Sequence, residues 1–176
     1  MEEIVNRVAN SSLLTIDLEE MYPEGEQVLY DIKDNLWEGF ALKEKDFRQF
    51  VKEKDWSVYK DKLVAIHCSV DAIVPTWAYM LLTTAISPFA RKVIFGDLSM
   101  MPSILFEDAI NAIDVEKYRD AKVVVKGCSK KAVPTSAFVK LTEKLMPVVK
   151  SMMFGEACSS VPLYKQPRNT SITKLD

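Results

Sequence analysis

Lys62-Leu-Val-Ala-Ile-His67 begins the stretch that decides the fold of this chain. It is a short and nearly all-apolar run, which is the pattern of a strand buried on both faces. Pro75 then stands at the start of a helix-patterned segment that ends at Ile86, and Lys92-Val-Ile-Phe-Gly96 is a second apolar run. Strand, helix and strand in this order predict a βαβ crossover with two parallel strands.

This strand–helix–strand unit is repeated further along the chain at an offset of 59 residues. Matching residues in the two copies are Asp55 and Asp114, Tyr59 and Tyr118, Pro75 and Pro134, Leu82 and Leu141, and Phe95 and Phe154. Two copies are too few for a solenoid. We therefore predict two pseudo-symmetric βαβα halves, about 37–92 and 95–150, followed by a final strand.

Hydrophobic periodicity places the remaining elements. Strand-like alternation at 13–17 and 27–32, with a turn at Pro23-Glu-Gly25, predicts an N-terminal hairpin within residues 1–36. Further strands are predicted at 37–42, 122–126 and 151–155, helices at 43–54, 103–113 and 135–149, and a polar tail at 163–176. The chain 1–176 is thus predicted to be a single α/β domain, with a largely parallel sheet and helices on both faces.

Composition narrows the classes of function. The 176 residues are 48% hydrophobic with a formal net charge of −2, which is typical of one globular domain and argues against nucleic-acid binding. The acidic start, Met1-Glu-Glu-Ile-Val5, is not a signal peptide, and no apolar run reaches the roughly 18 residues of a membrane helix. We expect a cytoplasmic protein that does not bind membranes. No phosphate-binding loop, dinucleotide fingerprint or zinc-protease motif is present, so the sequence identifies no enzyme.

The three cysteines of the chain share one local context. Each is followed by a serine, as Cys68-Ser69, Cys128-Ser129 and Cys158-Ser159, and each follows the end of a predicted strand. Parallel strands end at the same edge of a sheet, which is where open α/β sheets bind ligands. Helix N-termini at that edge favour the thiolate form. We therefore expect the three sulfur atoms to lie together.

Three thiolates predict a site for a metal ion such as zinc or for an iron–sulfur cluster, because such centres prefer sulfur ligands. Candidates for a further ligand or for hydrogen bonds to sulfur are His67, Asp97, Glu156, Ser69, Ser129 and Ser159. Two alternatives stay open. The first is a thiol-redox protein that uses one pair of these cysteines, and the second is that the cysteines are small core residues.

The candidate side chains also have structural interpretations. His67 directly precedes Cys68, so strand alternation points the two side chains to opposite faces, which favours a packed histidine. Asp97 and Glu156 both follow a Phe-Gly pair, and this position is typical of solvated loop acids or helix caps.

The predicted helix that covers residues 77–90 has almost no polar face. Trp77, Tyr79, Met80 and Leu81 are consecutive or nearly so in this segment. A helix that is apolar all round is covered by other structure. Residues 1–36 could supply the cover, or these four residues form the interface of a homodimer. In the latter case the alternative function is a non-catalytic interaction module.

Three segments carry a resemblance to a known family: His67-Cys-Ser-Val-Asp-Ala-Ile-Val-Pro75, Lys126-Gly-Cys-Ser-Lys130 and Phe154-Gly-Glu-Ala-Cys-Ser-Ser-Val-Pro162. With the opening Glu3-Ile-Val-Asn-Arg7, they resemble a small bacterial family, mainly from Bacteroidetes, that is known only as a domain of unknown function. The resemblance covers nearly the whole chain and implies no catalytic residue. Genes of the family often lie near those for iron–sulfur cluster assembly, so it implies iron–sulfur assembly proteins as partners.

Overall fold

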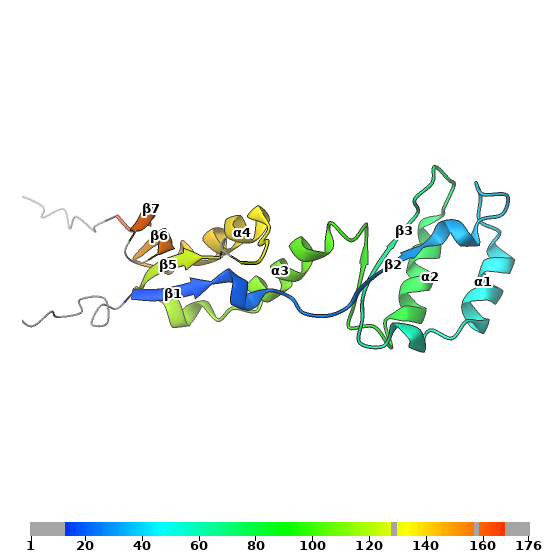
Figure 1. Ribbon diagram of the computed structural model, residues 1–176, viewed down its shortest axis with the longest axis horizontal. Coiled ribbons are helices and arrows are strands. Elements are labelled where there is room, and N and C mark those ends of the chain that lie inside the picture. The colour runs from blue at the N-terminus through cyan, green and yellow to red at the C-terminus, as the bar shows by residue number, and fades with distance from the viewer. Residues whose placement is uncertain (1–12, 128–129, 157–158, 168–176) are drawn as a thin grey trace, which may run out of the picture. The chain divides into compact units, whose positions relative to one another are not determined.

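The computed structural model describes residues 13–127, 130–156 and 159–167. The chain divides into two compact units (Figure 1). Unit 1 contains the residues up to Tyr22 and those from Leu105 onward, and unit 2 contains Pro23–Ile104. Each unit has its own sheet and its own core, so each is described separately.

Unit 2 contains a sheet of three parallel strands in the order β2-β3-β4. The strands are β2 (Gln27–Asp31), β3 (Leu63–His67) and β4 (Lys92–Phe95), and the helices are α1 (Glu44–Glu53) and α2 (Thr76–Ile86), with short 3-10 turns η2 (Ile32–Asn35) and η3 (Ser57–Tyr59). The parallel β3–α2–β4 crossover is the one that the opening stretch of sequence predicts.

Unit 1 contains a sheet of four strands in the order β1-β5-β6-β7. The strands are β1 (Leu13–Asp17), β5 (Lys122–Lys126), β6 (Ser151–Glu156) and β7 (Ser159–Lys165), the helices are α3 (Met101–Asn111) and α4 (Thr135–Leu145), and the 3-10 turns are η1 (Leu18–Met21) and η4 (Val115–Tyr118). The first three strands are parallel, and β7 lies antiparallel on the outer side of β6. Residues of α3 from Leu105 onward belong to this unit.

The internal repeat has a structural counterpart in the strand–helix–strand part of each unit. At the same offset β3 corresponds to β5, α2 to α4 and β4 to β6. The correspondence extends to the first strand of each sheet, because β1 and β2 both end at an aspartate that caps a 3-10 turn. Asp17 accepts a hydrogen bond from the Glu19 N–H at 2.9 Å, and Asp31 accepts one from the Lys33 N–H at 3.1 Å.

In each unit the two helices contribute to one core cluster. In unit 2, Val64 and Ile66, which share one face of β3, pack with the buried residues of α1 and α2, including Phe47 and Leu82. In unit 1, Val123 and Val125 pack in the same way with α3 and α4. The sequence predicts helices on both faces of one sheet, whereas within each of these clusters both helices lie over a single face.

The α/β class with mainly parallel strands is confirmed, but several of the more detailed sequence predictions are wrong. The N-terminal strands do not form a hairpin, because β1 pairs with β5 and β2 pairs with β3, both in parallel. Residues 37–42 form isolated bridges in place of a strand. The first three residues of the tail predicted at 163–176 belong to a strand, because β7 extends to Lys165. The strands also form two sheets in place of one.

Candidate functional site

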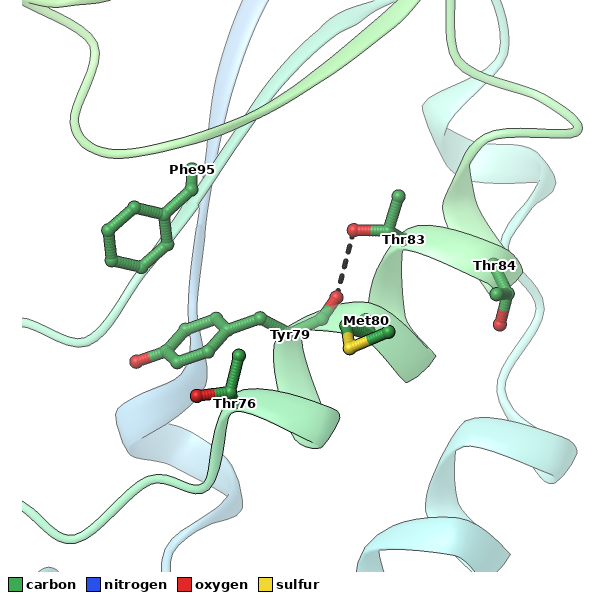
Figure 2. A pocket seen from close by; sticks show the side chains of 6 residues that line it. All are labelled: Thr76, Tyr79, Met80, Thr83, Thr84 and Phe95. Carbon is green, nitrogen blue, oxygen red and sulfur yellow. Dashed lines mark hydrogen bonds between the residues drawn. The ribbon is translucent and has the colours of Figure 1, made fainter.

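An apolar groove lies between α2 and β4 in unit 2 (Figure 2). It has a volume of about 640 Å³ and is lined by Thr76, Tyr79, Met80, Thr83, Thr84 and Phe95. The Tyr79 and Phe95 rings meet edge to face with centroids 5.1 Å apart. Met80 is 64% exposed and Phe95 is 67% exposed. We call this surface the α2–β4 groove.

Two of the four residues predicted for an interface line this groove. Tyr79 and Met80 do so. Trp77 and Leu81 do not line the groove and pack against the core of unit 2, which Tyr79 also contacts. The Trp77 ring lies 6.1 Å from that of Phe47. Helical periodicity explains the division, since consecutive residues of a helix point in different directions. Phe95 was not among the predicted site residues. The signal that could have pointed to it is its match to Phe154 in the repeat.

Unit 1 contains the matching surface in a covered form. Phe138 and Phe154, which correspond to Tyr79 and Phe95, also meet edge to face, with centroids 5.7 Å apart and the same interplanar angle of 82°. On β6, however, Phe154 is opposite Val161 of β7, and it is half-buried. Within the described ranges β4 pairs only with β3. In the part of the chain that the structure describes, the outer edge of β4 is therefore open, whereas the equivalent edge of β6 carries β7.

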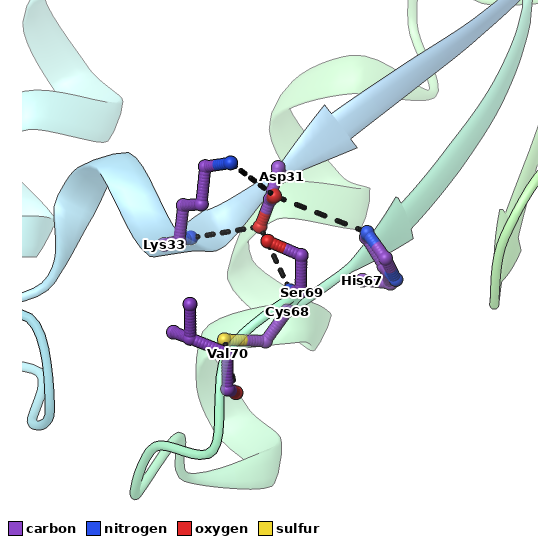
Figure 3. Close-up of polar contacts among 6 residues, drawn as sticks. All are labelled: Asp31, Lys33, His67, Cys68, Ser69 and Val70. Carbon is purple, nitrogen blue, oxygen red and sulfur yellow. Dashed lines mark hydrogen bonds and ion pairs between the residues drawn. The ribbon is translucent and has the colours of Figure 1, made fainter.

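A polar cluster lies at the carboxyl ends of β2 and β3 (Figure 3). Asp31 accepts hydrogen bonds from the Ser69 and Lys33 N–H groups, each at 3.1 Å, and its other carboxylate oxygen lies 3.3 Å from Lys33 Nζ. Burial opposes ionisation of Asp31, but the hydrogen bonds from Ser69 and Lys33 outweigh it and lower its pKa to about 2. The carboxylate thus fastens the residues after β3 to the end of β2.

His67 and Cys68 point to different sides of the strand end, as alternation predicts (Figure 3). The Cys68 thiol is half-buried and donates to the Val70 carbonyl at 3.3 Å. His67 Nε2 lies 3.9 Å from Asp31, and this buried nitrogen has no hydrogen-bond partner within the described chain. The two side chains are therefore not arranged to share one ligand.

Asp97 and Glu156 occupy matching positions after β4 and at the end of β6. Asp97 accepts a hydrogen bond from the Ser99 N–H at 2.8 Å, and hydrogen bonds from Ser99 are the main cause that lowers its pKa. Glu156 is exposed and lies opposite Ser159, the first residue of β7. Asp97 thus has the geometry of a turn cap.

The predicted thiolate cluster involves residues that the structure does not describe. Cys128, Ser129 and Cys158 lie outside the described residues. In the ranges 13–127, 130–156 and 159–167, no group of three or more histidine, cysteine or acidic side chains has the arrangement of a metal site. The joint position of the three sulfur atoms therefore stays a prediction.

The fold and these surfaces define an α/β protein with an internally repeated, mostly parallel architecture. The model of a family of proteins of unknown function, DUF2480, matches residues 2–166, and the chain belongs to this family. Comparisons with curated proteins and with solved structures gave no match. No helix in the described part of the chain is both long and apolar enough to cross a membrane.

Proposed function

We propose that this protein is a non-catalytic interaction module that receives an extended, apolar protein strand at the α2–β4 groove. The observation that carries the proposal is the difference between the two repeats. The edge of β6 carries β7, whereas β4 has one neighbouring strand in the described structure and exposes Phe95 beside the groove.

The chemistry of the surface fits such a partner. An open strand edge presents unpaired N–H and C=O groups that an added strand satisfies. The groove beside it is lined by an aromatic pair and Met80, whose flexible thioether side chain adapts to varied apolar shapes. Threonine side chains line the rest of the groove, but Thr83 and Thr84 donate their hydroxyl groups to backbone carbonyls of α2. Affinity thus depends on the strand edge together with Tyr79, Met80 and Phe95.

Replacing Met80 with glutamate should abolish most of this binding. Peptides selected from a displayed random library with the full chain are expected to be extended and rich in aliphatic and aromatic residues. Because burial of Met80 is lost and a charge must be desolvated, we expect Met80→Glu to raise their dissociation constants at least about tenfold. Fluorescence polarisation with labelled peptides measures the change.

Val139→Glu is the matched control. Val139 occupies the repeat position of Met80 on α4 and is 65% exposed, so this variant adds the same charge to the equivalent surface of unit 1. Its peptide affinity should stay at the wild-type value. Equal binding by wild type and Met80→Glu would refute the groove as the docking surface.

A second candidate function is coordination of a metal ion, such as zinc, or of an iron–sulfur cluster by cysteine thiolates. Its support is the position of Cys68 directly after the parallel strand β3 and before α2 in the chain. Cys128 shares this sequence context. Iron–sulfur assembly proteins are the partners that this candidate implies. Thiol exchange by one cysteine pair is its redox variant.

Metal content tests the second candidate. Protein purified without oxygen should contain iron or zinc in an amount near one site per chain, measured by elemental analysis, and an iron–sulfur cluster should add visible absorbance. Cys68→Ser should lower the content at least about tenfold, because serine is a poor ligand for these metals. Val139→Glu should keep the wild-type content. Metal-free wild-type protein would exclude stable coordination and leave the thiol-exchange variant.

A further inference from the structure

We propose that the strand docked on β4 is β4 of a second copy of this chain. The two strands pair antiparallel across a two-fold axis, so two sheets of three strands become one sheet of six. This inference rests on the proposed function, because it names the partner of the same open edge.

Two residues on the outer edge of β4 have backbone groups oriented to form hydrogen bonds with an incoming strand. The Gly96 N–H donates to the Ile66 carbonyl of β3 at 3.0 Å. Backbone groups alternate in direction along a strand, so the N–H and C=O groups of Val93 and Phe95 point to the opposite side. These two residues are the ones that can form a hydrogen-bonded pair with an incoming strand.

The equivalent strand in unit 1 shows which direction of pairing this edge accepts. β7 lies antiparallel on β6, with Phe154 opposite Val161. Phe154 is the repeat counterpart of Phe95, so an aromatic residue at this position already pairs there with a β-branched residue. Antiparallel self-pairing of β4 produces the same combination, because it sets Phe95 of one copy opposite Val93 of the other. Such cross-strand pairs are favourable.

The charges at the two ends of β4 select a second copy and fix the register. Arg91 and Lys92 stand at the amino end and Asp97 follows the carboxyl end. With the two-fold axis at Ile94, Val93 lies opposite Phe95 and Arg91 lies opposite Asp97 of the second copy. Both ends of the interface then join opposite charges, and the axis makes the contact self-complementary and closed.

This arrangement also covers the exposed apolar side chains. Because side chains that lie opposite each other share one face of the sheet, the two α2 helices lie on the same face of the six-stranded sheet. Phe95 and the α2–β4 groove of one copy then adjoin those of the other. The pairing removes the open edge and reduces the exposure of Phe95, which is 67% in the single chain.

Charge-exchange variants of the full chain test the pairing. We expect wild type to sediment as a dimer in analytical ultracentrifugation. Arg91→Glu brings two acidic side chains together at both ends of the interface, and Asp97→Lys brings two basic side chains together. Each variant alone should therefore dimerise at least about tenfold more weakly. An equimolar mixture of the two should regain dimers. In the mixed dimer, one end of the interface keeps the wild-type pair of Arg91 and Asp97, and the other end joins the two substituted side chains, which carry opposite charges.

The mixture separates a contact between copies from a loss of structure. Arg91 also donates to the Glu24 carbonyl and Asp97 also caps a turn, and neither of these effects is repaired by mixing. Val139→Glu should remain dimeric. A monomeric wild type, or variants that stay weak when mixed, would overturn the inference. If such a monomer still binds library peptides through Met80, the proposed function stands and only the second copy as partner is wrong.

Discussion

Trp56→Ala is expected to lower the free energy of unfolding by about 3–5 kcal/mol, because it removes a large side chain from a packed core. Trp56 is 6% exposed. Its Nε1 donates to the Val51 carbonyl at 2.8 Å, which ties the loop after α1 to the last turn of that helix. The alanine variant loses this hydrogen bond and leaves a cavity beside β2.

The effect extends to the neighbours of the indole. Trp56 lies 5.7 Å from the ring of Tyr30, 6.2 Å from that of Phe50 and 6.0 Å from that of Tyr59. Lys54 Nζ lies 5.0 Å from the Trp56 ring and within 6.0 Å of the other three. Tryptophan is the strongest partner for such a cation, so its removal also weakens the placement of Lys54 over the cluster.

Urea unfolding followed by far-UV circular dichroism measures the loss. Trp37→Ala is the matched control, because Trp37 is 42% exposed and contacts Lys43 and Phe40 at the surface. We expect it to cost less than about 1.5 kcal/mol. Equal losses of unfolding free energy in the two variants would show that the aromatic rings packed around Trp56 do not stabilise unit 2.

Asp31→Asn is expected to lower stability by about 1–2 kcal/mol at neutral pH. The folded protein holds the pKa of Asp31 at about 2, compared with about 3.9 in an unfolded chain. Folding thus favours the ionised form of Asp31. The stabilisation is smaller than the full pKa difference implies, because the side chain is partly exposed and solvent screens its interactions. Asparagine retains one acceptor but loses the charge that faces Lys33.

The pH dependence gives the sign of this contribution. A carboxyl group with a lowered pKa stabilises the folded state above its unfolded value, and this stabilisation is lost as the pH falls from about 5 towards 2. The difference between wild type and Asp31→Asn should therefore be largest near pH 7 and shrink below about pH 4. Urea unfolding at a series of pH values measures it.

Asp71→Asn controls for the loss of an exposed carboxylate in the loop after β3. It should change stability by less than about 0.5 kcal/mol at every pH. A difference for Asp31→Asn that stays constant down to about pH 2 would mean that its ionisation is not coupled to folding. The hydrogen bonds to Ser69 and Lys33 would then not stabilise the charged form.

Much of the local structure could be predicted from sequence. The apolar run before Cys68 is β3, and the segment from Pro75 to Ile86 is α2, within one residue at each boundary. The apolar helix predicted over 77–90 extends too far, because α2 ends at Ile86. The first two predictions succeeded because strand and helix periodicities are local and strong in this chain. The repeat also predicted β5, α4 and β6 from β3, α2 and β4.

The candidate site was only partly predictable. The apolar character of α2 pointed to Tyr79 and Met80, but their partner Phe95 belongs to another element and appeared only in the fold. β7 was missed because Pro162 and the flanking polar residues weaken its strand pattern, although a proline is tolerated on an edge strand. The geometry of the cysteine edge is described at Cys68 alone.

The sequence by itself determined that the chain is α/β, that it alternates strands and helices, and that it contains two copies of one unit. Only the tertiary structure decided that β1 joins β5 and β2 joins β3, so that the consecutive strands β1 and β2 belong to different sheets. The reason is physical: backbone hydrogen bonds are the same for every pair of strands, and pattern in the sequence shows which face of a strand is buried but not which strand lies beside it. The choice of neighbouring strand depends on how a whole set of side chains packs. Ile16 of β1 packs in the core of unit 1, and Tyr30 of β2 packs in the core of unit 2.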